Sequence, residues 1–500
     1  MAWADLTSLL LFGYAAYLGS ELVLSAGFAL AGWMRSRKRA QCVEPDLDPK
    51  IAAALEDPQL PAIALVLVAR NDAERIVETV RAYLSIFYPR LGIILIDDGS
   101  TDGTLERLTE ALELAPMPIM RSGSLSTAIV ESTWVSRRDP RLRVIRQGER
   151  GHACALNTGL DFSAESPLLC TAEAGIIPED DALLRMLVPF LESKSMVAVQ
   201  GAAQPLAGAG AAAPSYAAMP ADPRALVQFL EWTRAVFLTR GTQRWIFSRV
   251  WLAPGITVYL RQGLLEISGF SENAGCERLD ALLRIRAARA RAKEPCHFRL
   301  VSEKICGAPV PTHFRSLARE RLAWGRGLAD ALRAQGRSLG NPKTRGFGLL
   351  NLPYLYFYEW LGPVLALLTV AVASLHDSLG AGGLSGILLV YGLLALTGLA
   401  LRVATTLLAL RAEHPLTYAR LPRRLLIRQA LREAVVFRSL LWLFASAAHW
   451  PNFRRRPGPA KAIPGAGQQT MDLSAETQTE PELTLPESAG DSEKDGHRVA

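Results

Sequence analysis

The sequence predicts an α/β protein in which a domain built on a mostly parallel sheet is carried by transmembrane helices. Two observations predict it. Between residues 62 and 201, strand-length apolar segments alternate with helical segments, as in a parallel sheet covered on both faces. Long apolar runs flank that region, and 50% of the 500 residues are hydrophobic although 21% are charged. That composition is typical of a folded domain attached to membrane segments.

The predicted strands and helices follow one another in a regular order. The segment "AIALVLVAR" (62–70) is an apolar run of strand length, and residues 72–87 have apolar positions at helical spacing. A second strand (92–97) and a second helix (104–115) repeat the pattern. The further strands and helices predicted in the same way are 141–146, 167–174 and 196–201, and 151–163 and 179–193. In such a sheet, ligands bind beyond the carboxyl ends of the strands.

Two adjacent carboxylates end the second strand, in "GIILIDDGSTDGT" (92–104). A calcium loop beginning at Asp98 would need a glutamate at its twelfth position, where the chain has Thr109. A plain turn, with Asp102 capping the helix from Thr104, explains the third aspartate. It does not explain why Asp97 and Asp98 stand side by side, because their repulsion needs a polar ligand to offset it. We therefore expect this pair to form part of a binding site.

The apolar runs predict the membrane topology. Residues 6–34 are long enough to span a bilayer and are followed at once by "RSRKR" (35–39). A signal peptide carries its positive charge before the apolar run, so this segment is interpreted as an anchor whose C-terminal end is cytoplasmic. Residues 347–375 and 384–410 are two further predicted spans, and the stretch after the second is strongly basic. The charges place residues 61–345 in the cytoplasm.

The C-terminal region gives weaker signals. Residues 434–450 form a short apolar segment that contains Arg438 and precedes "RRR" (454–456), so an amphipathic helix on the inner surface is favoured over a third span. The Gly-, Ala- and Pro-rich segment 204–224 is predicted to be a loop. The predicted organisation is an anchor (1–34), a basic linker (35–60), a cytoplasmic domain (61–345), a C-terminal membrane region (346–455) and a disordered tail (456–500).

Composition excludes several classes of function. The six cysteines include no CxxC pair, which favours a reduced compartment and buried thiols over a structural zinc site. The basic stretch at 422–432 is explained by attraction to anionic lipid. Nucleic acid is not an expected partner, because no basic patch with interleaved aromatic residues is present. A transporter is disfavoured, because Glu21 is the one acidic residue in mid-span.

Several segments, in order, resemble a known family. "VLVARNDAE" (66–74), "LIDDGSTDGT" (95–104) and "GHACALNTGL" (151–160) are similar to the family-2 glycosyltransferases, which have the Rossmann-like GT-A fold. Three later segments resemble the membrane-embedded branch that includes cellulose, chitin and poly-N-acetylglucosamine synthases. They are "VQFLEWTRAVF" (227–237), "ERLAWGRGL" (320–328) and "GFGLLNLPYLYFYEWLGPVL" (346–365). The resemblance covers about residues 1–455.

The resemblance implies a multi-pass protein of a bacterial-type inner membrane, with its catalytic domain in the cytoplasm. Its activity would be the inverting transfer of a sugar from a nucleotide-sugar to a polysaccharide or lipid-linked acceptor. Membrane lipid and other subunits of a polysaccharide-assembly system are the further partners implied. Such a transfer needs positive charge on the leaving diphosphate, usually from Mg²⁺ or Mn²⁺, and a general base for the acceptor hydroxyl.

The resemblance also implies roles for single residues. Asp97 and Asp98 would contact the nucleotide, and Asn71 and Asp72 would line the same pocket. His152 begins the helix that follows, at a position where the family usually has lysine, and would lie at the same donor pocket.

The remaining roles implied are those of the metal ligand, the base and the acceptor platform. Glu173 is the candidate metal ligand, Glu277 or Asp280 the candidate base, and Trp324 the candidate platform for the acceptor. The plain alternatives are a solvent-facing carboxylate for Glu173, a surface charge for Glu277 and a membrane-interface side chain for Trp324.

The chain departs from the family pattern at the catalytic motifs. Thr171 takes the first position of the metal-binding Asp-x-Asp, and Arg278 takes the position of the base, although a guanidinium cannot accept a proton. Glu320 and Ala323 replace the glutamine and arginine of the Gln-x-x-Arg-Trp motif. These departures leave a second interpretation open: a catalytically impaired protein that binds a nucleotide-sugar, or a scaffold subunit.

Overall fold

The computed structural model describes residues 2–41, 51, 55, 60–205 without 124, 126, 173 and 174, 223–242, 255–308, 314–378 and 384–413. All lie in the first of two compact units, Met1–Arg454 and Arg455–Ala500. Four predictions concern residues outside this set: the metal role of Glu173, most of the 204–224 loop, the helix at 434–450 and the tail from 456.

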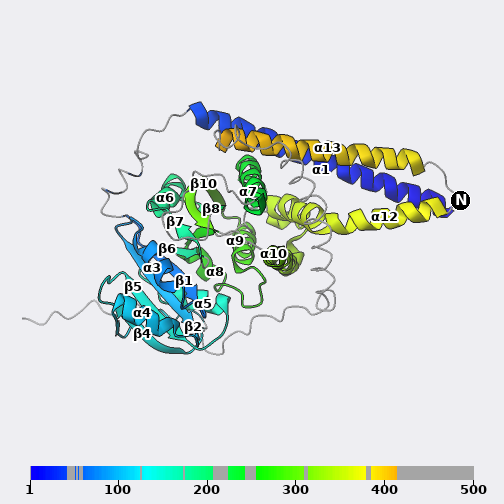
Figure 1. Ribbon diagram of the computed structural model, residues 1–500. Helices are drawn as coiled ribbons and strands as arrows, with labels where there is room; N and C mark the ends of the chain where they lie inside the picture. Colours follow the sequence, from blue (N-terminus) through cyan, green and yellow to red (C-terminus); the bar gives the residue numbers. More distant parts are fainter. Residues whose placement is uncertain are drawn as a thin grey trace, which may run out of the picture. The chain divides into compact units, whose positions relative to one another are not determined.

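A mixed sheet of ten strands forms the core of the domain, and its centre is parallel (Figure 1). The order is β3-β4-β5-β2-β1-β6-β9-β8-β10-β7. Strands β5, β2, β1 and β6 run parallel, and so do β8 and β10, whereas β9 is antiparallel to both of its neighbours. The strands are β1 (Ile63–Ala69), β2 (Leu91–Asp98), β3 (Leu114–Pro116), β4 (Val130–Ser136), β5 (Leu142–Gln147), β6 (Leu168–Ala172), β7 (Ile177–Pro178), β8 (Met196–Pro205), β9 (Gly255–Leu260) and β10 (His297–Ala308). The predicted α/β fold is confirmed.

Helices cover both faces of this sheet because its central strands are apolar on both sides. Ile93 and Leu95 of β2 pack in one core cluster with α3 (Ile76–Leu84), α4 (Thr104–Leu112) and α6 (Ala182–Glu192). Ile94 and Ile96 pack in the other, with α5 (His152–Asp161), α9 (Glu277–Ala292) and α10 (Phe314–Ala334). The short α8 (Arg261–Glu266) follows β9. Side chains of a strand alternate between faces, so the continuous run "IILI" serves both layers.

Five strands, β3, β4, β7, β9 and β10, were not predicted. β4 has the sequence "VESTWVS", a polar strand next to the edge strand β3, without an apolar run. The expected segments at 62–70, 92–97, 141–146, 167–174 and 196–201 correspond to β1, β2, β5, β6 and β8. β9 and β10 lie within residues 255–308, and both pair with β8. Their pairing is non-local, and sequence periodicity does not report it.

Two helices of the described chain are long and apolar enough to span a membrane, Asp5–Arg37 in α1 (Ala2–Gln41) and Leu388–Ala412 in α13 (Leu384–Glu413). The expected span at 347–375 has a different form. Two π-helical segments, η4 (Phe347–Asn351) and η5 (Leu355–Leu361), flank α11 (Leu352–Tyr354) and lead into α12 (Gly362–Ser378). Together these segments form one uninterrupted helical run from Phe347 to Ser378, and its role as a membrane span stays a prediction.

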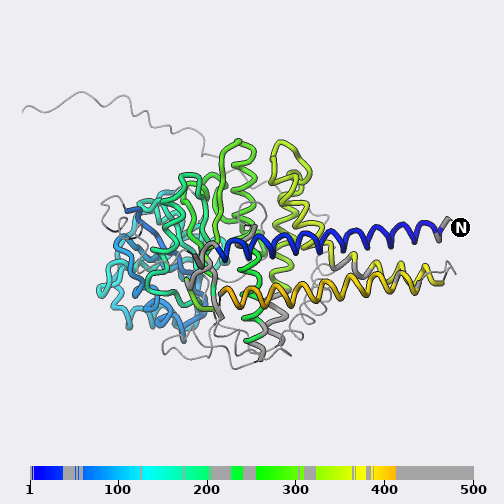
Figure 2. Tube along the Cα trace, turned by 90° about the horizontal axis from the view of Figure 1, so that it is seen from above, coloured from blue at the N-terminus to red at the C-terminus, as the bar shows by residue number. Residues whose placement is uncertain are grey.

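These helices pack on one another and on α7 (Pro223–Thr242). α1 contacts α7, α12 and α13, and Figure 2 shows α1 and α13 running side by side. Thr7 Oγ1 and His376 Nδ1 are 2.8 Å apart, joining α1 to α12 in a buried hydrogen bond. A Cβ on Gly32 would lie 2.6 Å from the carbonyl oxygen of Phe237. A glycine is therefore required where α1 meets α7.

The contact between α5 and β1 allows a test of the core. A Cβ on Gly159 would overlap both methyl groups of Val66, and a β-branched side chain has little rotamer freedom to move away. Gly159→Ala is expected to cost about 1–3 kcal/mol, seen as a lower midpoint of thermal unfolding in detergent. Gly92→Ala in β2 is the control, because nothing lies within 4 Å of its added Cβ. Equal midpoints for the two variants would contradict this packing.

Candidate functional site

Asp98, the last residue of β2, is 1% exposed and is bonded only to the protein. Its Oδ1 accepts hydrogen bonds from Gln147 Nε2 (2.7 Å) and from the backbone N–H of Arg150 (3.1 Å). Its Oδ2 accepts one from the N–H of Gly151 (2.8 Å). A carboxylate that accepts backbone N–H groups forms strong, charge-assisted bonds. Asp98 therefore fixes the loop that leads into α5.

Asp97 is equally buried, at 0% exposure, but is bonded on one side only. Its Oδ1 accepts the N–H of Ser100 at 3.1 Å. Its Oδ2 is buried and has no hydrogen-bond partner in the part of the chain that the structure describes. A buried carboxylate oxygen without a donor is costly, and such an exception calls for an explanation. A donor group on a ligand would supply the missing bond.

Asn71 ends the turn after β1 with a positive φ of 50°. Its N–H donates to Ser100 Oγ at 3.0 Å, and its Oδ1 accepts the N–H of Thr101 at 2.9 Å. Asparagine tolerates this left-handed conformation better than most residues. The exposed side chain of Asn71 thus binds the turn after β2, and the two turns form one unit beside Asp97.

Asp72 and Asp102 complete that unit. The N–H of Asp72 donates to Thr104 Oγ1 at 3.2 Å, and the N–H of Ala73 donates to Asp102 Oδ2 at 3.0 Å. Asp102 Oδ1 also accepts the N–H of Thr104, the first residue of α4, at 3.1 Å. The bond from Thr104 Oγ1 and the Ala73 N–H hold the pKa of Asp102 below its usual range. Asp102 caps α4 as expected, although Gly103 occupies the N-cap position itself.

His152 and Glu277 meet across the site. Each is the first residue of its helix, α5 and α9 respectively. His152 Nδ1 lies 3.6 Å from Glu277 Oε1, with side-chain exposures of 45% and 26%. Burial raises the pKa of Glu277, but the bond to His152 and the charges of His152 and Arg278 outweigh burial and hold that pKa below its usual value. Glu277 is therefore ionised at neutral pH.

Arg278 follows Glu277 and is half-buried. Burial raises the pKa of the Tyr259 hydroxyl, and the Arg278 charge opposes that rise. Thr257 and Thr171, which face each other across β9 and β6, also act on the pKa of that hydroxyl, in the same direction as Arg278. Arg278 thus brings positive charge beside β9, the neighbour of the strand that carries Thr171, where the family pattern has carboxylates.

Asp280, the other candidate base, has a different environment from Glu277. It is 3% exposed, and its Oδ2 lies 3.4 Å from Arg284 Nη1. Arg284 also donates to the carbonyls of Gly269, at 2.8 Å, and Ile267, which hold the loop after α8. Burial raises the pKa of Asp280, and Arg284 only partly offsets that rise. Asp280 therefore supports α9, and its role as a base stays a prediction.

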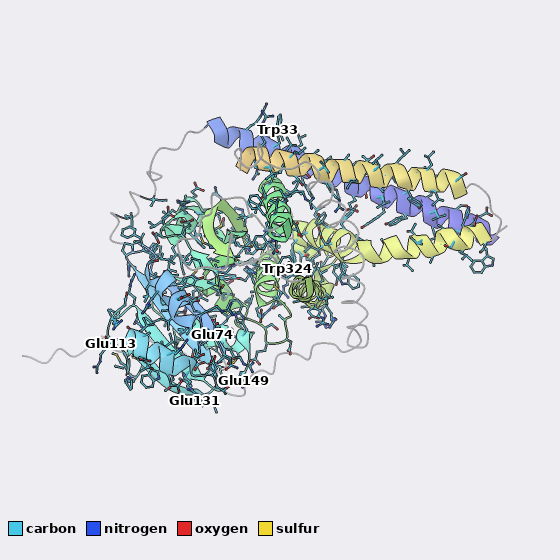
Figure 3. All side chains as sticks on the ribbon, viewed as in Figure 1. Trp33, Glu74, Glu113, Glu131, Glu149 and Trp324 are labelled. Carbon is cyan, nitrogen blue, oxygen red and sulfur yellow. The ribbon has the colours of Figure 1, made fainter. Side chains whose placement is uncertain are left out.

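Trp324 comes from α10 and is half-buried beside the core on the α9 face (Figure 3). Three residues further on, a Cβ on Gly327 would overlap the Cβ of Cys276. Gly327 therefore lets α10 approach the residue that precedes Glu277 as closely as two backbones allow. The structure brings Trp324 to the same end of α9 as Glu277.

The described residues do not by themselves form a metal site. Among them, no three His, Cys, Asp or Glu side chains converge. Thr171 offers a hydroxyl, and Glu173 lies outside the described residues.

Gln147 is a part of the site that sequence reasoning missed. It ends β5, next to the end of β2, and its Oε1 accepts the hydroxyl of Thr158 on α5 at 2.6 Å. A signal was present, because a polar residue after a predicted parallel strand lies at the same edge as Asp98. Ser100 and Tyr259 were missed because their partners become visible only in the folded chain.

Comparisons with known proteins agree with this architecture. Residues 64–205 match the family model described as "Glycosyl transferase family 2", which confirms the predicted family for that segment. The chain is 27% identical over 146 residues to a poly-beta-1,6-N-acetyl-D-glucosamine synthase of Staphylococcus epidermidis, covering 29% of each chain. It is 21% identical over 277 residues to the probable glycosyltransferase YdaM of Bacillus subtilis (strain 168), covering 54% of this chain and 56% of that one. The chain thus matches about a third to a half of the length of these relatives.

Solved structures with a similar fold include a mannosyltransferase of Pyrobaculum calidifontis in complex with GDP-Man and Mn²⁺. That likeness has a TM-score of 0.47 and 19% identity, and covers 85% of this chain and 99% of the other. A second is TarS 1–349 of S. aureus in complex with UDP-GlcNAc, with a TM-score of 0.33 and 14% identity over 72% of this chain and 92% of the other.

We expect the same substitution, aspartate to asparagine, to have opposite effects on stability at Asp97 and at Asp98. Asp98→Asn replaces an oxygen that accepts N–H groups by a donor, and is expected to cost about 1–3 kcal/mol. Asp97→Asn removes charge from an oxygen that no described residue bonds, and is expected to leave stability unchanged or raised. Thermal unfolding of the two variants without nucleotide measures the difference. Asp97→Asn melting below Asp98→Asn would show that the roles are reversed.

Proposed function

We propose that the chain is a membrane-bound glycosyltransferase that moves a sugar, with inversion, from a nucleotide-sugar donor to a hydroxyl of a glycan or a lipid-linked acceptor. One observation carries this proposal. In a domain whose residues 64–205 match family 2, the fully buried Asp97 at the carboxyl edge of the sheet keeps one carboxylate oxygen that no described residue bonds. The ring N–H of a nucleotide base would supply that donor.

The reaction requires two changes of bonding at one carbon. The acceptor oxygen attacks the anomeric carbon from the face opposite the diphosphate, so a C–O bond forms there while the bond to the diphosphate breaks. The hydroxyl proton must pass to a base, and the pair His152–Glu277 lies on the side of the site where α5 and α9 begin.

A divalent cation, Mg²⁺ or Mn²⁺, is part of the proposal through Glu173. Magnesium is commonly held by one or two carboxylates together with substrate phosphates, so one glutamate and the donor's own diphosphate would hold it. When bound, the cation would supply positive charge to the leaving diphosphate. The charge of Arg278, at the start of α9 and beside Tyr259 of β9, acts in the same direction.

The acceptor side is proposed to face the membrane helices. α1 and α13 meet the requirements for spanning a bilayer, and Arg37 stacks 4.2 Å above the ring of Trp33 near the end of α1 (Figure 3). Tryptophan and arginine are typical of the membrane–water interface. A site on the cytoplasmic side, with Trp324 as the platform for the acceptor, would receive a growing glycan or a lipid-linked sugar there.

Donor turnover by the purified full-length chain tests the proposal. In nanodiscs with Mn²⁺ and a panel of UDP- and GDP-sugars, one donor is expected to release its nucleoside diphosphate. Asp97→Asn is expected to weaken nucleotide binding at least tenfold, about 1.4 kcal/mol, measured by calorimetry. The matched control is Glu165→Gln, whose carboxylate is 86% exposed and 3.8 Å from Arg143 at the opposite edge of the sheet; it should bind as the unaltered chain does.

The possible negative results separate the two interpretations. Tight binding of a nucleotide-sugar without turnover of any donor would support the impaired or scaffold protein instead. Absence of both binding and turnover would refute the proposal as a whole.

A further inference from the structure

The contact between His152 and Glu277 is held from both sides. The N–H of Gly151, the residue before His152, is bonded to Asp98 at 2.8 Å. Arg150, one residue earlier, pairs with Glu272 on the loop before α9, at 3.4 Å. These bonds tie the start of α5 to β2 and to the segment before Glu277. The backbone beside both residues is therefore held in place, so the contact of the imidazole with the carboxylate does not depend on the side-chain conformations alone.

The contact favours one tautomer of the imidazole. Glu277 Oε1 faces Nδ1 of His152, and an ionised carboxylate only accepts hydrogen bonds. A ring with its N–H on Nδ1 directs that N–H at the carboxylate and keeps the lone pair on Nε2. No residue of the described chain bonds Nε2, and the side chain is 45% exposed. The distance of 3.6 Å is of the kind that shortens when substrate closes a site.

Glu277 itself is less suited to accept the proton. His152 and Arg278 hold its pKa below its usual value, and a base works best when its pKa lies near the working pH. Asp280 is buried against Arg284, and the guanidinium of Arg278 accepts no proton. An imidazole changes its charge between about pH 5 and 8, which suits a general base in the cytoplasm.

We propose that His152 is the general base of the transfer, and that Glu277 is a positioning residue that orients its ring. This inference rests on the proposed function and assigns one of its steps. Nε2 takes the proton of the acceptor hydroxyl as the acceptor oxygen bonds the anomeric carbon and the sugar–diphosphate bond breaks. The imidazolium that forms keeps its Nδ1–H on Glu277, whose negative charge stabilises it until the proton leaves to solvent.

The charges around His152 give the direction of the pH dependence. Glu277 faces it from α9 with Arg278 next in the chain, Asp98 lies behind Gly151, and the Arg150–Glu272 pair bridges the loops beside it. Catalysis needs the lone pair of Nε2, so protonation of the ring stops the transfer and gives the rate an acid limb. Removing the negative charge of Glu277 makes the imidazolium less stable, which moves this acid limb to lower pH.

The test is a pH–rate profile of the full-length chain in nanodiscs, with the donor that it turns over. His152→Gln is expected to lower kcat by about 10²–10⁴-fold, to lose the acid limb, and to bind the donor within twofold of the unaltered chain. Glu277→Gln is expected to lower kcat less and to shift the acid limb to lower pH. A purely structural role of Glu277 would lower the rate without moving the limb.

The matched control is His297→Gln, the same substitution at an exposed histidine. His297 is the first residue of β10, and its side chain is hydrogen-bonded to Ser195. Its profile should equal that of the unaltered chain. If His152→Gln keeps both the rate and the acid limb, the inference is overturned while the proposed function stands. If the unaltered chain turns over no donor, the proposed function fails and this step fails with it. Donor binding by His152→Gln shows that the variant is folded.

Discussion

The three hydrogen bonds that Asp98 accepts are the interaction on which the rest of the site depends. They join the end of β2 to Gln147 and to the backbone of Arg150 and Gly151. A full negative charge, 1% exposed, is tolerated there because all of its bonds point at N–H groups of one short loop. That loop sets where α5 begins and hence where His152 stands. The two adjacent aspartates thus differ, since Asp98 holds the loop with both of its oxygens and one oxygen of Asp97 is bonded by no described residue.

Much of the fold could be predicted from the sequence because its signals are local. β1 and β2 are continuous apolar runs, and α3 and α4 have helical periodicity between turn residues, so each element is visible within about ten residues. The strands β4, β9 and β10 were missed, because a strand near the edge of the sheet such as β4 needs no apolar run and the pairing of β8 with β9 spans a gap of some fifty residues. Such pairing depends on tertiary context.

The candidate site was predictable in part for the same reason. Asp97 and Asp98 were found because two charged residues end an apolar strand. The contact of His152 with Glu277, in contrast, joins residues that only the fold brings together. Helical spacing places Asp280 one turn after Glu277. It does not indicate which of the two side chains becomes buried when α10 and the loop after α8 pack against α9. The answer lies in Arg284, whose bonds to the carbonyls of Gly269 and Ile267 draw Asp280 into the interior.

The start of α9 receives support from two directions, and this explains why the site is placed there. From the sheet, Asp98 and α5 present His152 to Glu277. From the other side, Gly327 lets α10 pack against Cys276, the residue before Glu277. α10 leads through the π-helical segments at 347–361 to α12, which packs on α1. Any shift of α1 or α12 that moves α10 therefore acts on the start of α9, because closely packed backbones leave no space to absorb it.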